Sequence, residues 1–158
     1  MTAKRGLETL LAEHPLFKDL APDDLALIAG CGKNVRFEEG RYIFREGEPA
    51  NHFYLIRHGL VALEIFSPER GPLVTETIGE GEVLGWSWLF PPYRWSSDAR
   101  ALELTRAVAM DGACLRGKCE TDPRLGYELM RRFAQIIMER LHATRMRLLD
   151  IYGRVPVA

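Results

Sequence analysis

The chain has 158 residues, and its 21 basic and 22 acidic side chains give a formal net charge of −1. This length corresponds to a single domain, and 47% hydrophobic with 27% charged residues is ordinary for a soluble globular protein. Balanced charge excludes a general attraction to nucleic acid or to an anionic membrane. Because no apolar run approaches the roughly 18 residues of a membrane span, and no signal-peptide core is present, we expect a cytoplasmic protein without membrane contact.

The first 33 residues predict two short helices. Apolar residues at helical spacing cover 7–11, and Pro15 ends this helix because the residue before a proline disfavours the α conformation. A second helix begins at Pro22, with acidic side chains in its first turn, and ends at Gly30.

Residues 34–113 predict a set of short antiparallel strands. Glycine and proline turn signals recur along this region, separated by apolar or alternating runs at 41–44, 53–56, 60–65, 74–78 and 101–110. Such punctuation is typical of a jelly roll, an antiparallel double-stranded β-helix. The fold class is therefore mainly β with flanking helices.

Residues 121–152 predict a long C-terminal helix that begins after Thr121-Asp122-Pro123. Its residues spaced alternately by four and three form a stripe, called the seam below: Met130, Ala134, Ile137, Leu141, Thr144, Leu148 and Ile151. The mean spacing of 3.5 is typical of a helix that packs against a partner helix, which predicts a homodimer. A second stripe, Leu129, Phe133 and Ile136, would attach the helix to its own strands. A helix that folds back on those strands, or breaks, is the alternative.

Three cysteines, Cys31, Cys114 and Cys119, match no zinc or iron–sulfur spacing, because no two of them are separated by two residues. They also form no disulfide framework. We expect buried, reduced thiols.

The segment 45–59 resembles the cyclic nucleotide-binding domain family, which shows a Gly-x-x-Ala/Ser-x-x-aromatic-Tyr-hydrophobic-Ile-x-x-Gly pattern there. This segment reads Arg45-Glu46-Gly47-Glu48-Pro49-Ala50-Asn51-His52-Phe53-Tyr54-Leu55-Ile56-Arg57-His58-Gly59. Segments 79–85 and 99–101 and the order of elements are also similar, over nearly the whole chain. The resemblance implies the family's β-roll, as in the sensor halves of catabolite activator-type bacterial regulators. Gly47 and Gly59 are expected in turns that require positive φ.

The resemblance also implies a ligand site, the phosphate-binding cassette. In the family a Gly opens a short helix, a Glu accepts from the ribose 2′-OH, and an Arg with an adjacent hydroxyl residue binds the phosphate. Gly85 and Ser96 match, but Trp86 stands at the Glu position and Trp95 at the Arg position. An indole has one donor and no acceptor, so it replaces neither contact. Losing both would weaken binding by roughly two to four decades, which disfavours ordinary cAMP or cGMP binding.

The candidate ligand-binding residues are Gly85, Trp86, Ser87, Trp88, Arg94, Trp95, Ser96, Ser97 and Thr144. Arg94 would reach the site only if a bulge turned it inward, and Thr144 matches a family threonine that reaches the adenine, often across a dimer. A register role or a bond within its own helix is the alternative for Thr144. The indoles allow three interpretations: a collapsed ligand-free core, a pocket remodelled for a flat small molecule, or a cyclic nucleotide in an altered pose.

Catalysis and metal binding are not expected. The four histidines, His14, His52, His58 and His142, lack the His-x-His spacing of metal-dependent jelly-roll enzymes, and nothing positions a haem on one of them. No nucleophile elbow or phosphate loop appears.

Direct DNA binding is not expected either. Family regulators continue into a helix-turn-helix domain, and residues 148–155 resemble the hinge before it, but only 156–158 follow. Seven arginines against three acidic residues in 124–154 are better explained as a solvated helix face. We therefore predict a stand-alone regulatory module, acting either as a ligand sensor or as a ligand-free dimeric interaction module.

Overall fold

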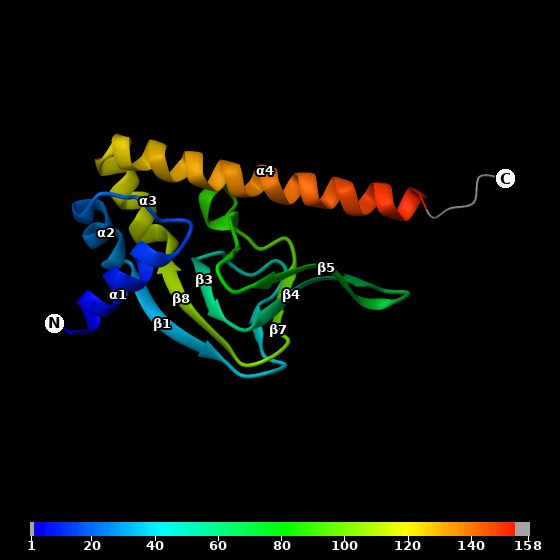
Figure 1. The fold of residues 1–158 in the computed structure, drawn as a ribbon. Coiled ribbons are helices and arrows are strands. Elements are labelled where there is room, and N and C mark those ends of the chain that lie inside the picture. The colour runs from blue at the N-terminus through cyan, green and yellow to red at the C-terminus, as the bar shows by residue number, and fades with distance from the viewer. Residues whose placement is uncertain (1, 154–158) are drawn as a thin grey trace.

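Two four-stranded antiparallel sheets form a β-roll in the computed structural model, which describes residues 2–153 (Figure 1). One sheet has the order β1 (Gly32–Phe37), β8 (Thr105–Asp111), β3 (His52–His58) and β6 (Val83–Leu84). The other has the order β2 (Tyr42–Phe44), β7 (Asp98–Ala101), β4 (Leu60–Ser67) and β5 (Gly71–Gly79). This architecture confirms the predicted fold class.

Helices precede, interrupt and follow the strands of the roll along the chain. They are α1 (Thr2–Glu13), α2 (Pro22–Ala29), the short 3₁₀ helix η1 (Ser87–Leu89), α3 (Gly112–Thr121) and α4 (Pro123–Gly153). Figure 1 shows α1, α2 and α3 gathered at one end of the roll, while α4 runs along it and projects beyond it. The helix α4 is continuous over 31 residues, without the break that was the alternative. The hinge-like segment extends into 154–158, which lies outside the described residues.

Two features differ from the sequence prediction. The expected strand 101–110 is divided, because β7 ends at Ala101 and β8 starts at Thr105. The helix α3 was not predicted, although Asp111 caps it by accepting a hydrogen bond from the backbone N–H of Cys114 at 3.0 Å. Two glycines within α3, Gly112 and Gly117, conceal it in the sequence pattern.

Buried side chains form two clusters. The first joins the helices to the β1–β8–β3 sheet and includes Phe17, Leu115, Leu129 and Phe133, with Ile136 packed against it. This confirms the predicted stripe that attaches the C-terminal helix to the strands. The second fills the interior of the roll: Phe44, Ala50, Ile56, Val61, Ile78, Leu84, Trp95, Ala99 and Ala107.

Glycine at position 59 is required by both its conformation and its surroundings. Gly59 has φ 107°, and a Cβ there would lie 2.6 Å from the Cα of Thr105. Gly47 also has positive φ, at 85°. Both turns are as the sequence predicts.

The expectation of reduced thiols is wrong for two of the three cysteines. Cys31 and Cys114 are joined by a disulfide, with their Cα atoms 5.7 Å apart and a sequence separation of 83. The β1–β8 pairing, in which Gly32 faces Met110, brings the two segments together. Cys119 is a free, partly buried thiol, and burial raises its pKa.

Within residues 2–153, no helix has both the length and the apolar character needed to cross a bilayer.

Candidate functional site

The segment after β6 occupies the place of the predicted cassette. Gly85 takes φ 96°, and the helix that follows is the single 3₁₀ turn η1, only three residues long. The chain then turns and returns along the loop at Gly47, where Gly47 donates to the carbonyl of Trp95 at 2.8 Å and Trp95 donates to that of Glu48 at 3.0 Å. These two hydrogen bonds fix the backbone on either side of Trp95.

The indole of Trp95 lies inside the roll, against Gly85. It stacks on Phe44 with ring centroids 3.7 Å apart and an interplanar angle of 8°, and the residue is 6% exposed. A Cβ built on Gly85 would be 2.6 Å from two carbons of this ring. The side chain at the position of the family arginine therefore fills the space above the cassette glycine.

The other two indoles lie elsewhere. Trp88 belongs to the helix-facing cluster, where it stacks on Phe53 at 4.7 Å and meets Phe133 edge-on at 5.3 Å. Trp86 is half-buried against the same cluster, with the guanidinium of Arg140 over its ring at 5.0 Å. The three tryptophans do not line one common pocket, because η1 turns the side chain of Trp88 toward Phe133 on α4, away from Trp95.

Arg94 does not supply the missing charge. Its Nη1 donates to the carbonyl of Gly47 at 2.8 Å and the residue is exposed, while its neighbour Trp95 points into the roll. The hydroxyl residues remain near the surface: Ser96 is exposed, and Ser87 and Ser97 are half-buried. The inward turn of Arg94 considered from the sequence does not occur.

Thr144 is exposed on α4, and its hydroxyl donates to the carbonyl of Arg140 at 2.8 Å, one turn back on the same helix. This local bond agrees with the structural alternative for this residue.

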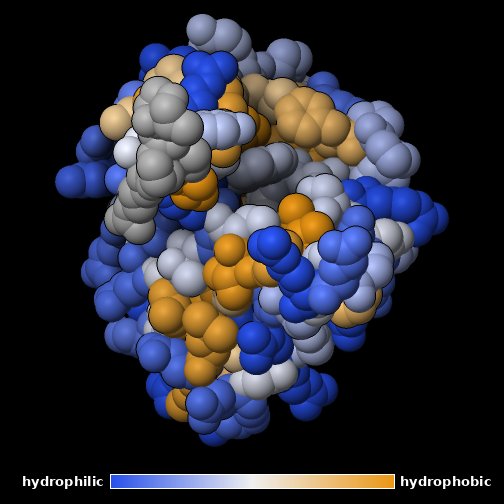
Figure 2. All heavy atoms as spheres, turned by 90° about the vertical axis from the view of Figure 1, so that its right-hand side faces the viewer, coloured by the Kyte–Doolittle hydropathy of each residue, from blue (hydrophilic) through white to orange (hydrophobic). Residues whose placement is uncertain are grey.

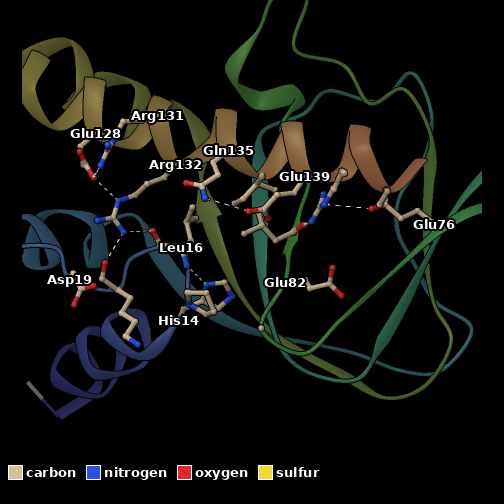
Figure 3. A pocket seen from close by; sticks show the side chains of 17 residues that line it. His14, Leu16, Asp19, Glu76, Glu82, Glu128, Arg131, Arg132, Gln135 and Glu139 are labelled. Carbon is tan, nitrogen blue, oxygen red and sulfur yellow. Dashed lines mark hydrogen bonds and ion pairs between the residues drawn. The ribbon is translucent and has the colours of Figure 1, made fainter. Parts of the chain in front are cut away.

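A groove of about 620 Å³ lies between α4 and the roll, lined by residues from 14–19, 76–83 and 128–143 (Figure 3). Arg140 closes one side: its Nε lies 3.5 Å from the carboxylate of Glu76, and it donates through Nη2 to the carbonyl of Val83. Its Nη1 is buried and makes no hydrogen bond within the described residues. Burial lowers the pKa of Arg140 and raises that of Glu76, and their mutual attraction opposes both shifts.

His14 forms part of the same groove, and it is 7% exposed. Its Nδ1 accepts a hydrogen bond from the backbone N–H of Leu16 at 3.1 Å, which places the ring proton on Nε2. Nε2 makes no hydrogen bond of normal geometry in the described part of the chain, although the backbone of Glu82 lies close to the ring. Burial lowers the pKa of His14 to about 4, although the nearby backbone of Glu82 acts in the opposite direction. The ring is therefore neutral at pH 7.

The groove is not among the sites expected from the sequence, where His14 is one of four scattered histidines and Arg140 belongs to a solvated helix face. No local pattern could reveal it, since three segments far apart in sequence meet there.

Exposed hydrophobic side chains gather at the projecting end of the molecule, on both sides of a hollow (Figure 2). On α4, residues 141–153 are all exposed. The apolar ones are Leu141, Met146, Leu148, Leu149, Ile151 and Tyr152. The β4–β5 hairpin adds Ile65, Phe66, Leu73 and Val74. Arg147 connects the two elements by donating to the carbonyl of Thr75 at 2.6 Å.

The cyclic nucleotide-binding domain family matches residues 34–122, more than half of the chain. The chain belongs to this family. Among residues 2–153, no three His, Cys, Asp or Glu side chains come together as a metal site.

Several known proteins are similar to most of the length of this chain. The CRP-like cAMP-activated global transcriptional regulator of Mycobacterium tuberculosis is 28% identical over 151 residues, which cover 95% of this chain and 66% of the regulator. A solved Geobacter metallireducens protein is 30% identical with a TM-score of 0.75, covering 90% of this chain and all of that one. The sensor domain of the regulator DNR from Pseudomonas aeruginosa is 22% identical with a TM-score of 0.73, covering 90% and 95% of the two chains. The chain thus spans just under two thirds of the M. tuberculosis regulator.

Proposed function

We propose that this regulatory domain of the cyclic nucleotide-binding family keeps its cassette closed with its own Trp95 and does not bind cAMP or cGMP in the usual way. The observation that carries the proposal is the Trp95 ring, stacked on Phe44 and in contact with Gly85. A nucleotide would have to displace this ring, and moving a buried large apolar side chain into water costs about 1.5–3 kcal/mol. Neither Trp86 nor Arg94 offers a charged contact in return.

We expect neither cAMP nor cGMP to bind wild-type protein saturably below about 1 mM. The three tryptophans make intrinsic fluorescence a direct readout, because Trp95 lies at the cassette itself. Calorimetric titration checks the result independently of fluorescence. A micromolar dissociation constant for either nucleotide would contradict the closed cassette.

The output of the domain is proposed to pass through α4 in a cytoplasmic homodimer. The residues of α4 beyond Arg140 are all exposed, and they include the seam residues Leu141, Leu148 and Ile151. Apolar surface of this extent is typical of a protein–protein contact. The seam repeat matches a second copy of the same helix, and the β4–β5 hairpin offers further apolar surface beside it.

Leu141→Arg is expected to raise the dimer dissociation constant about 100-fold or more, since it places two charges in the apolar seam. Leu141 is 49% exposed in one copy, so folding should be unaffected. Met146→Arg is the matched control, because Met146 is 52% exposed on the same helix but lies outside the seam. Size-exclusion chromatography with light scattering should show a monomer for the first variant and a dimer for the second. Monomeric wild-type protein, or equal behaviour of the two variants, would contradict a dimer through α4.

A further inference from the structure

We propose that the groove between α4 and residues 14–19 is a ligand site for a small zwitterion of the α-amino acid type. This site lies outside the cassette, and its proposal rests on the proposed function only in assuming that the cassette is closed. The groove, at about 620 Å³, is within the size range of small-molecule sites. Its chemistry comes from two kinds of group, buried donors and carboxylates at the rim.

The buried donors are the Nε2–H of His14 and the Nη1–H of Arg140. Neither makes a hydrogen bond of normal geometry within the described residues, although the backbone of Glu82 lies close enough to the His14 ring to oppose the lowering of its pKa. Both side chains line the groove. Buried N–H groups in proteins are almost always paired, so a ligand or water must supply the oxygen. A carboxylate is the suited group, because it carries only acceptors and its charge is attracted to the Arg140 guanidinium.

The carboxylates are Asp19, Glu82 and Glu139, which line the groove but form no ion pair within residues 2–153. Glu82 comes from the roll and Glu139 from α4 (Figure 3). Glu82 lies close enough to Glu76 to raise the pKa of that carboxyl.

The groove is also lined by Lys18, Arg131 and Arg132, of which the two arginines pair with Glu128. The three carboxylates therefore outnumber the remaining cation, Lys18, which disfavours a purely anionic ligand and favours an ammonium group. A molecule with both charges matches both halves of the site.

The residues of α4 that line the groove lie on a different face of the helix from the seam. At about 100° per residue, Glu128, Gln135 and Glu139 lie on the side of the helix away from Met130, Ile137 and Leu141. A ligand held between the roll and this face would add contacts that seat α4 while leaving the seam free. The site is therefore suited to regulate the proposed dimer helix without competing with the partner.

The test uses the whole chain and a panel of the twenty common L-amino acids, screened by thermal shift and confirmed by calorimetry at up to about 10 mM. At least one is expected to bind saturably. For that amino acid, the analogue without the amine and the analogue without the carboxylate should each bind about tenfold or more weakly. Absence of binding across the panel overturns the proposal, and so does equal binding of either truncated analogue.

Variants locate the binding. Glu82→Gln is expected to weaken the amino acid about tenfold, whereas Glu80→Gln, an exposed carboxylate on the same turn outside the groove, should leave affinity unchanged. Arg140→Gln should also weaken binding, with Arg147→Gln as the control for attachment of α4 to β5. Unchanged affinity in Glu82→Gln overturns the groove assignment. Binding of cAMP in the same calorimeter would overturn the closed cassette instead, so the two failures are distinguishable.

Discussion

Reduction of the Cys31–Cys114 disulfide is expected to lower the free energy of unfolding by about 4–5 kcal/mol. The bond joins residues 83 apart in sequence, and closing a loop of that length restricts the unfolded chain by about this amount. It also ties the start of β1 to the first turn of α3, which packs on the start of α4. Urea unfolding with and without dithiothreitol measures the difference, and the melting temperature should fall by about 10 °C or more.

Two variants separate the disulfide from other effects of the reductant. Cys31→Ser should be as unstable as the reduced wild type and insensitive to dithiothreitol. Cys119→Ser removes the free thiol and should keep the sensitivity of the wild type. Equal stability of oxidised and reduced wild-type protein would show that the crosslink contributes nothing.

The fold can be predicted from the sequence because the features that indicate its strands and helices are local. Turn glycines such as Gly47 and Gly59 mark the ends of strands through their backbone conformation alone. The stripe Leu129, Phe133 and Ile136 identifies the buried face of α4 through helical spacing alone. Neither signal depends on knowing what lies across the interface.

Features that depend on distant partners were missed. The disulfide follows from the register of β1 on β8, which no cysteine spacing encodes. The groove needs His14, Glu82 and Arg140 to meet from three separate segments. Even α3 was hidden, since its glycines weaken the helical pattern and its stability comes from the Asp111 cap and buried Leu115.

The candidate site was predicted in its chemistry but not in its arrangement. The replacement of charged cassette positions by Trp86 and Trp95 can be read directly from the motif. The directions of the side chains cannot, because one turn of 3₁₀ helix sends Trp88 to Phe133 while the next segment sends Trp95 to Phe44. Tryptophans that are close together in sequence therefore belong to two different buried clusters, one facing the helices and one inside the roll.

The double substitution Trp86→Glu with Trp95→Arg is expected to tighten cAMP binding by about 100-fold. Removing the Trp95 ring frees the space between Phe44 and Gly85, and the new side chains restore an acceptor for the ribose and a cation for the phosphate. Two charged hydrogen bonds are worth roughly two to four decades. We expect the lower end, because Arg140 lies 5.0 Å from the Trp86 ring and would compete for the introduced carboxylate.

The matched control is Trp86→Gln with Trp95→Leu, which opens the same space without introducing charge. Both double variants lose the buried Trp95 ring, at a cost of about 3–5 kcal/mol, so calorimetry with cAMP belongs at low temperature with the disulfide oxidised. Tight binding by the charged variant alone would mean that the cassette frame is intact and that two side chains close it. If both variants fold and neither binds, the backbone from Gly85 to Trp95, with its three-residue η1, is itself unsuited to a cyclic phosphate.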